Sequence, residues 1–270
     1  MKIKRDFFKP FVIPLLLVSA WEVFAHNHAL LTFVYRIVGY PLAKIPDFSF
    51  LSPLSEISAA FISLITEAEF YSQIGNTLQI LLTSFSIATL LGIAGGLFIS
   101  LYKNSELFFI STIDALRSIP PIVLLPLFIL FLGIENQMKI TFVLFGGIWP
   151  ILLNTYFGVK NIDPVFLKVT QNLQLKKSGK LFKVILPLSS PAIFTGIKIA
   201  LSLCLILTIV CEMLIGNKGV GFLINYAKRN SEYPEMYAGI FLVAVIGFFI
   251  NKFLKYVDRR FLSWYYQSQK

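Results

Sequence analysis

Runs of about 20 apolar residues recur along this chain, and they restrict its fold more than any other feature. An α-helix of that length spans the hydrocarbon core of a bilayer, because it rises about 1.5 Å per residue. Hydrophobic residues make up 56% of the 270 residues and charged residues 14%, whereas soluble domains average about 45–50% and about 25%. The sequence therefore predicts an all-α integral membrane protein.

Six apolar segments are long enough to cross the membrane, so we expect about six transmembrane helices. The first resembles a secretory signal, because VFAHN (23–27) looks like a cleavage site. Bulky Trp21 and charged Glu22 lie just before that point, which favours a retained helix. The approximate bounds of the segments are 11–31, 77–101, 107–132, 141–159, 192–215 and 237–256.

The second and third segments carry local signals. Small residues at every fourth position of the second segment let another helix approach closely, and we expect this stripe to pack within the chain. Pro120, Pro121 and Pro126 predict that the third segment is kinked or broken. Irregular backbone in a membrane is tolerated where protein or a water-filled path covers it, which makes Pro120 and Pro121 pathway candidates. The small residues are Ser84, Ala88, Gly92, Gly96 and Ser100.

Lysine and arginine are concentrated before the first segment, after the sixth, and in the stretch 160–187. Basic residues are retained on the cytoplasmic side, so this stretch and both termini are predicted to be cytoplasmic. Loops assigned to the opposite side hold fewer basic residues, Lys139 among them. The formal net charge of +10 is then a property of the cytoplasmic flanks, and no nucleic-acid partner is expected. The acidic, amphipathic stretch 53–71 predicts a helix at the outer interface.

The cytoplasmic stretch 160–187 has the signals of an ordered helix. Asp163 and Pro164 form a typical helix start. An apolar stripe follows at every fourth position, and the pair Lys176 and Lys177 is expected to end the helix before Ser178 and Gly179 break it. A basic helix of this kind lies against anionic lipid or docks a soluble partner. The apolar stripe consists of Val165, Val169 and Leu173.

With this stretch in view, the chain resembles, over about residues 53–264 and more weakly before them, the membrane-spanning subunit of a bacterial ABC-type importer of the nitrate/sulfonate/taurine permease group. In that family the cytoplasmic loop holds a coupling helix with a Glu-Ala-Ala start, a Gly six residues after the Glu, and an apolar-x-Leu-Pro end. The end matches at VILP (184–187), with Leu186 and Pro187. Other matches follow in family order at Trp21-Glu22, 115–134, 189–201, 211–227 and 236–264.

The start of the loop departs from the family pattern. Counted back from Pro187, the family Glu falls at Lys168, the family Gly at Gln174 and an alanine position at Thr170. A charge reversal at Lys168 either suits a diverged ATPase or marks weakened coupling. The resemblance implies that Lys168, Lys176 and Lys177 steer an ATPase while the apolar stripe inserts into its groove.

The resemblance further implies a type I, MetI-like permease fold in one transmembrane domain (1–270), with its core at 53–264 and its coupling loop at 160–187. Two copies of this subunit would line a path in the bacterial cytoplasmic (inner) membrane. Two ABC ATPase subunits would bind below, and an extracytoplasmic binding protein would deliver the solute. Sulfonates, taurine, nitrate and thiamine-precursor-like compounds are the solutes of the group, and alternating access is the implied mechanism.

Glu212 matches an acidic position of the family and lies near the outer end of the fifth segment. An ionisable group at membrane depth is a functional candidate, and its alternative role is a helix-end hydrogen bond or an ion pair. Gly216, Gly219 and Gly221 follow it and are expected to form tight turns at an outer gate. Arg117 is a further pathway candidate, or it extends to the headgroups.

The sequence has no G-x-x-x-x-G-K-[ST] phosphate loop, so we expect a subunit that couples to ATP hydrolysis elsewhere and is not itself an enzyme. No cofactor is expected. A metal site is not expected either, because His26 and His28 point in different directions on a helix. Two other classes stay open. A secondary carrier or channel would more often carry charged relays or inverted repeats, and a diverged permease-like scaffold would explain Lys168 and Gln174.

Overall fold

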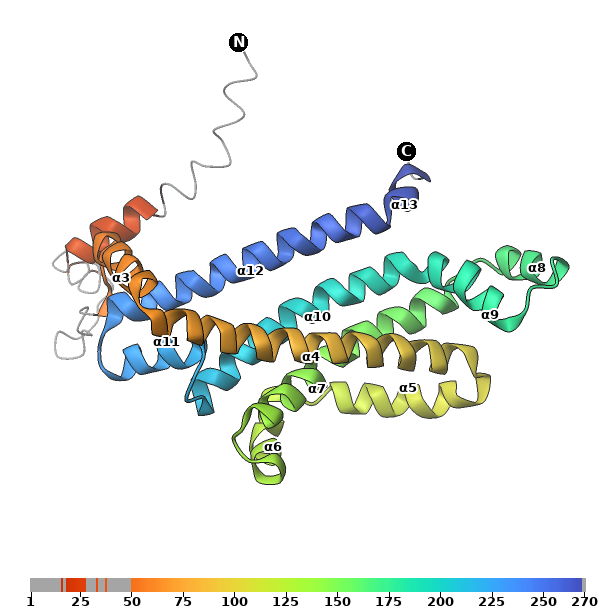
Figure 1. The fold of residues 1–270 in the computed structure, drawn as a ribbon, viewed down its shortest axis with the longest axis horizontal. Helices are drawn as coiled ribbons and strands as arrows, with labels where there is room; N and C mark the ends of the chain where they lie inside the picture. The colour runs from red at the N-terminus through yellow and green to blue at the C-terminus, as the bar shows by residue number, and fades with distance from the viewer. Residues whose placement is uncertain (1–15, 17, 28–32, 34–36, 38–49, 269–270) are drawn as a thin grey trace, which may run out of the picture. The chain divides into compact units, whose positions relative to one another are not determined.

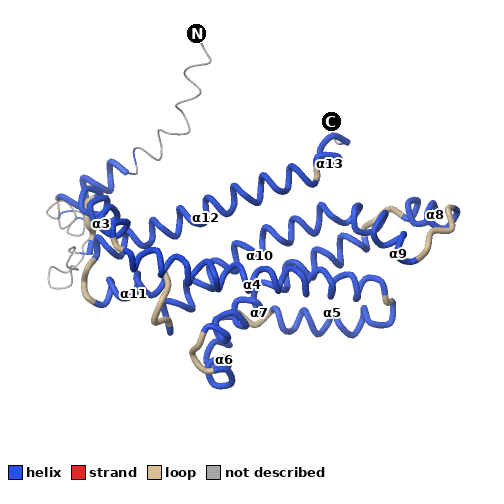
Figure 2. The backbone as a smooth tube through the Cα atoms, viewed as in Figure 1, coloured by secondary structure: helices blue, strands red, loops and turns tan. Residues whose placement is uncertain are grey.

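The regular elements of the protein are helical throughout the part of the chain that the structure describes (Figures 1 and 2). The computed structural model describes residues 16, 18–27, 33, 37 and 50–268, without the side chains of 103–108, 266 and 268. This confirms the predicted all-α class. The first helix covers residues 18–26; the later elements are α3 (Leu54–Thr66), α4 (Ala68–Leu101), α5 (Lys103–Arg117), η3 (Pro121–Leu124), α6 (Leu125–Leu132), α7 (Asn136–Lys160), α8 (Pro164–Asn172), α9 (Lys177–Lys180), η4 (Leu181–Ile185), α10 (Leu186–Ile215), α11 (Val220–Arg229), α12 (Tyr233–Phe261) and α13 (Ser263–Ser268).

Four helices in the described part are long and apolar enough to cross a membrane, and a fifth span results if one bent pair is counted. They correspond to the second, fourth, fifth and sixth predicted segments, and each is longer than its apolar run. Of the first predicted segment, residues 11–15, 17 and 28–31 lie outside the described residues, as do the basic residues Lys2, Lys4, Arg5 and Lys9 before it. Which side of the membrane the termini occupy stays a prediction. The four helices are Ala68–Leu101, Asn136–Lys160, Lys177–Ile215 and Tyr233–Phe261.

The third predicted segment is broken at its prolines. Its two halves, Phe109–Arg117 and Pro121–Leu132, are bent by 84° relative to each other. Pro120 and Pro121 lack backbone donors, so the chain passes from α5 through a short 3-10 turn before α6 begins. The expected break is confirmed, and it gives either a broken span or a re-entrant loop.

The chain divides into two compact units. Unit 1 consists of residues 1–71 and 223–242, and unit 2 of residues 72–222 and 243–270. Within unit 1, Phe61 of α3 meets Phe241 of α12 edge to face, with ring centroids 5.3 Å apart. This contact joins the predicted interfacial helix to the start of the last long helix.

The core of unit 2 lies where α7 and α10 run side by side (Figure 1). Glycines bring the two backbones together: a Cβ added at Gly147 would overlap Cys204, and one at Gly196 would lie 2.7 Å from the carbonyl oxygen of Pro150. Because there is no room for a Cβ atom at these positions, α7 and α10 form a closely packed pair. Buried residues of α4, α6 and α12 complete the cluster; its members are Ile80, Leu81, Leu125, Met138, Phe142, Val143, Leu201, Cys204, Leu207, Cys211 and Leu254.

The small-residue stripe of the second segment packs inside unit 2, as expected. Ser84 and Ala88 are fully buried. A Cβ at Gly92 would lie 2.8 Å from the Cβ of Ile151, and one at Gly96 would lie 2.6 Å from the Cβ of Thr155. The stripe is therefore the surface of α4 that receives α7.

Candidate functional site

The helix predicted for the 160–187 stretch exists as α8, and it begins where the sequence indicates. The Asp163 side chain accepts a hydrogen bond of 2.8 Å from the backbone N–H of Val165, and Pro164 occupies the first turn. Such a cap satisfies one of the free amides at a helix start. In Figure 1, α8 and α9 lie beyond the ends of α7 and α10.

The apolar stripe of α8 faces away from the rest of unit 2. The Val165, Val169 and Leu173 side chains are 61%, 46% and 66% exposed, and Phe166 beside them is half exposed. Lys168, Lys176 and Lys177 are also exposed, whereas Leu186 and Pro187 are partly buried. An exposed apolar stripe with lysines around it has the anchor spacing of a helix that binds in a groove. The coupling role itself stays a prediction.

The end of α8 differs from the expectation, because Lys176, Lys177, Ser178 and Gly179 do not terminate it. The helix ends at Asn172, and Lys177–Lys180 begin the next helix. Gln174 has a φ of 47°. Its N–H bonds to the carbonyl of Gln171 at 3.0 Å, and the N–H of Leu175 bonds to that of Thr170 at 3.1 Å.

These two hydrogen bonds form a Schellman motif, whose left-handed residue is usually glycine. Gln174 is the residue at which the importer resemblance expects Gly. The backbone conformation that a glycine would favour is thus present, with glutamine in it. Left-handed backbone costs an ordinary L-residue roughly 1–2 kcal/mol, so other contacts of this loop hold it in place.

A second candidate centre surrounds the buried carboxylate of Glu212, near the end of α10. The hydroxyl of Thr77 in α4 donates to this carboxylate and lies 2.9 Å from both oxygens. The same hydroxyl accepts a 2.9 Å hydrogen bond from the N–H of Val220, and the N–H of Gly221 donates to Glu212 Oε2 at 3.0 Å. Glu212 therefore fastens α4 and the start of α11 to α10.

The glycines after Glu212 fit closely around its side chain. Gly219 has a φ of 112°, and a Cβ there would overlap the carboxyl group. The N–H of Gly219 donates to Oε1 of Gln73. A Cβ at Gly221 would lie 2.8 Å from the Cβ of Glu212, and the N–H of Gly216 bonds to the Glu212 carbonyl. Of the three predicted turn glycines, Gly219 is the one that has a positive φ.

Lys139 is the main correction to the sequence interpretation, which assigned it to a solvent-facing loop. It lies in the first turn of α7 and is 1% exposed. Its ammonium group acts electrostatically on Glu212. A cation near a helix N-terminus and an anion near a helix C-terminus are both unfavourable for the helix dipoles.

The remaining pathway candidates lie at the break in the third segment. Pro121 packs close to Gly146 of α7. Arg117 pairs with Asp114 at 2.8 Å, with both side chains about half exposed. An exposed pair contributes about 0–1 kcal/mol, so this contact gives no sign of a buried relay.

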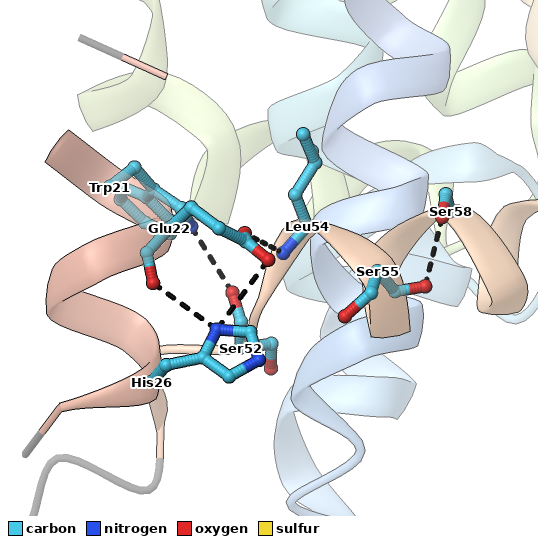
Figure 3. Close-up of polar contacts among 7 residues, drawn as sticks. All are labelled: Trp21, Glu22, His26, Ser52, Leu54, Ser55 and Ser58. Carbon is cyan, nitrogen blue, oxygen red and sulfur yellow. Dashed lines mark hydrogen bonds and ion pairs between the residues drawn. The ribbon is translucent and has the colours of Figure 1, made fainter. Parts of the chain in front are cut away.

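The first helix is joined to α3 by the Trp21-Glu22 pair (Figure 3). Glu22 Oε2 accepts a 2.7 Å hydrogen bond from the N–H of Leu54, and Trp21 Nε1 donates to the carbonyl of Ser52 at 3.1 Å. Residue 53, at the cap position of α3, is proline, which makes no side-chain cap. Glu22 thus supplies that cap from a distant helix, and the Trp21 ring also meets Tyr237 edge to face at 5.4 Å.

Sequence reasoning missed Gln73, Thr77 and Lys139. Each is a single polar residue beside or within an apolar run, and its partners are more than 70 residues away along the chain. Thr77 carried no periodic signal at all. The described residues include no group of three His, Cys, Asp or Glu side chains placed to hold a metal ion.

The described residues, with several membrane-length helices and an exposed helix between two of them, have the architecture of a multi-span membrane protein. The sequence matches the family of binding-protein-dependent transport system inner membrane components over residues 88–263, and the chain belongs to that family. It is therefore a permease subunit of an ABC importer, as the resemblance implied.

Individual relatives agree with this assignment. The chain is 29% identical over 208 residues to SsuC of Bacillus subtilis (strain 168), a permease named for aliphatic sulfonates, covering 77% of this chain and 75% of SsuC. It is 32% identical to the nitrate import permease NrtB of Leptolyngbya laminosa, covering 72% and 70%. Among solved structures, a bacterial alginate ABC transporter with an alginate pentasaccharide-bound periplasmic protein matches with a TM-score of 0.61 at 16% identity, covering 96% of both chains. This likeness shows the fold, which is that of MetI-like, type I importer permeases.

Proposed function

We propose that this subunit carries a small oxyanion solute through the bacterial cytoplasmic membrane, with ATP hydrolysed by a separate ATPase. The relatives named for sulfonates and nitrate support this solute class, since both solutes are small oxyanions whose oxygens carry the negative charge. Two permease copies, two ATPase subunits and an extracytoplasmic binding protein complete the proposed complex. The family's description as the membrane component of binding-protein-dependent systems supports the binding-protein partner.

The observation that carries the coupling proposal is the exposed stripe of α8. Val165, Val169 and Leu173 expose apolar area that a partner's groove would cover, and burying such side chains is worth about 1.5–3 kcal/mol each. The lysines around the stripe suit an ATPase surface that carries acidic residues. We propose that α8 inserts into a groove of the ATPase and transmits its motion to α7 and α10.

The backbone at Gln174 supports retained coupling against a scaffold that has lost transport. If the loop no longer had a function, we would expect residue 174 to adopt an ordinary backbone conformation with a negative φ. Instead Gln174 keeps a positive φ, and both Schellman hydrogen bonds are present around it. Lys168 is exposed on α8, so its charge reversal changes the docking surface and not the fold of the loop. We therefore propose that Lys168 meets an acidic residue of its own ATPase.

The Glu212 centre supports a gate role. It joins α4, α10 and the turn before α11 by hydrogen bonds that would have to break or move together if this end of the bundle opened. In alternating access, that end would be the outer gate. Gly219, packed on the carboxylate, would be the part that closes it.

The docking proposal is tested by placing aspartate on the stripe. Tagged V169D/L173D should reach the membrane in normal amounts but lose its stoichiometric ATPase when purified from native membranes in mild detergent. F182D is the matched control, because Phe182 is 66% exposed but lies on η4 outside the stripe. Equal ATPase recovery with V169D/L173D and with F182D would refute the assignment.

A further inference from the structure

A pocket of about 500 Å³ lies within unit 2, away from the Glu212 centre. Its walls come from the second half of α7, the first half of α10, and the region where α12 passes into α13. This volume is within the range of small-molecule sites, about 300–1,000 Å³. The pocket therefore has the size to take a small solute or a lipid headgroup.

An ion pair between two helices forms part of the wall. Nζ of Lys198 in α10 lies 2.8 Å from Oδ2 of Asp258 in α12, and the two side chains are 36% and 7% exposed. A lysine ammonium has three hydrogen-bond donors, so the bond to Asp258 leaves donors of Lys198 for a ligand. The pocket thus presents one cation with spare donors and one anion held beside it.

Neutral acceptors lie along the other walls. The side-chain amide of Asn154 donates to the carbonyl of Pro150 at 2.8 Å, which leaves its oxygen as an acceptor. The hydroxyl of Thr195 donates to the carbonyl of Pro191 at 2.9 Å, which leaves the lone pairs of the hydroxyl oxygen to accept a hydrogen bond. Such oxygens suit an ammonium group, whereas Lys198 suits an acidic oxygen.

The helices that line the pocket are in direct contact with one another. A Cβ at Gly158 would lie 2.7 Å from Ala192, so α7 and α10 touch where these two residues line the pocket. The ring of Phe194 in α10 lies 6.1 Å from that of Phe261 in α12. Because both contacts are between apolar groups, a ligand that displaced the ion pair would leave the helices in place.

The charge pattern selects the ligand class. A simple anion at Lys198 would also meet the Asp258 carboxylate, and a simple cation at Asp258 would meet the Lys198 ammonium. A molecule with a primary ammonium and an acidic oxygen group a short distance apart complements both. We infer that this pocket, lined by Asn154, Thr195, Lys198 and Asp258, binds a zwitterion with an ammonium and an oxyanion, either a free solute or a phosphatidylethanolamine headgroup.

The soluble source is tested by calorimetry on the purified full chain, with three probes that share a two-carbon chain. Taurine carries both charges, isethionate replaces the ammonium by a hydroxyl, and ethanolamine lacks the acidic group. Taurine should bind at least about 10-fold tighter than either analogue, because each leaves one wall group without its partner. Equal binding of taurine and isethionate would overturn the inference for a soluble ligand.

The lipid source is tested by native mass spectrometry of chain reconstituted in nanodiscs. Phosphatidylethanolamine should be retained over phosphatidylglycerol, whose headgroup has no ammonium. Either source supports the inference. Failure of both taurine and phosphatidylethanolamine to exceed their analogues would overturn it.

Variants link binding to the pocket. K198M and D258N should each lower zwitterion affinity about 10-fold or more, and the double swap K198D/D258K should recover most of it while keeping the fold. K255M is the control, since Lys255 is exposed on α12 and outside the pocket wall. Unchanged affinity in a folded K198M would place the ligand elsewhere. Binding needs no ATPase, so this result is independent of the coupling proposal.

Discussion

The Thr77 hydroxyl lies 2.9 Å from both carboxylate oxygens of Glu212, a residue 135 positions later in the chain, and so joins α4 to α10. It also accepts the backbone N–H of Val220. One side chain thus connects α4, α10 and the start of α11. A gate that opened at this end would have to separate these three elements at this hydroxyl.

Removing the charge at this centre should destabilise the protein strongly. We expect E212Q to lower the free energy of unfolding by about 2–4 kcal/mol, because it weakens the buried charge-assisted hydrogen bonds from Thr77 and from the N–H of Gly221. T77V should cost about 1–3 kcal/mol. Tryptophan fluorescence during unfolding in SDS-enriched mixed micelles measures both.

The double variant T77V/E212Q provides the check on that contact. If the two side chains act together, the combined loss should be smaller than the sum of the single losses by about 0.5–3 kcal/mol. Strict additivity would show that the hydroxyl and the carboxylate stabilise the bundle independently, contrary to the contact described.

Gly219 has a positive φ and is also packed against a carboxyl group. Gly133 has only the positive φ, so a comparison of the two glycines separates the two effects. G219A should be more destabilising than G133A by about 1–3 kcal/mol, because both residues have a positive φ but only at Gly219 would the new Cβ overlap a carboxyl group. Gly133 has nothing within 4 Å of its Cβ position. Equal losses in the same unfolding assay would mean that backbone conformation alone requires glycine at residue 219.

Restoring glycine at the end of α8 should stabilise the loop. Q174G should gain about 0.5–1 kcal/mol locally, because glycine adopts the left-handed conformation without strain. The Leu175 amide, which bonds to Thr170, should then exchange its hydrogen about 2–5-fold more slowly.

Q171G is the control for that change. Gln171 lies within α8, where glycine costs about 1 kcal/mol relative to alanine, so exchange in this helix should become faster. Faster exchange at Leu175 in Q174G as well would show that glutamine is not strained at residue 174.

The cap that Glu22 supplies to α3 predicts a local effect. E22A should speed hydrogen exchange at the Leu54 amide about 5-fold or more, since a lost cap costs about 1 kcal/mol. E56A, in the first turn of the same helix, removes an acidic residue without removing the cap and should change exchange at Leu54 less. Similar rates in both variants would contradict the capping role.

Helix contact at the small-residue stripe should depend on which glycine is changed. G96A places a Cβ against the carbonyl of Leu152 and the side chain of Thr155, whereas G95A meets only the flexible end of Leu152 at 3.3 Å. We expect a loss of about 1–3 kcal/mol for G96A and less than about 1 kcal/mol for G95A. Comparable stability of the two variants would show that α4 and α7 have room to separate.

The sequence predicted those features that depend on neighbours along the chain. Asp163 marked the start of α8, Pro120 and Pro121 marked the bend of 84°, and the small residues of the second segment marked the contact with α7. Each of these follows from local backbone chemistry or helical spacing. The apolar stripe of α8 was also visible, because a period of about four residues is a helix signal.

The features that the sequence did not predict depend on distant partners. The sequence predicts a helix end at Ser178 and Gly179, but α8 already ends before Gln174, where the two Schellman hydrogen bonds form. The distribution of basic residues predicts a loop position for Lys139, because that argument assumes that charged residues at the ends of apolar segments face solvent. Its burial depends on the helices packed against α7, which no pattern within α7 reveals.

The long separation of Thr77 and Glu212 also sets an order for assembly during synthesis. At about 5–20 residues per second, α4 leaves the ribosome roughly 7–27 seconds before the carboxylate that it binds. During that interval Thr77 is in the translocation machinery or the bilayer without its acidic partner. Insertion of α10 is therefore the step that completes this end of the bundle, and a chain truncated before residue 212 would present an unmatched hydroxyl on α4 to membrane quality control.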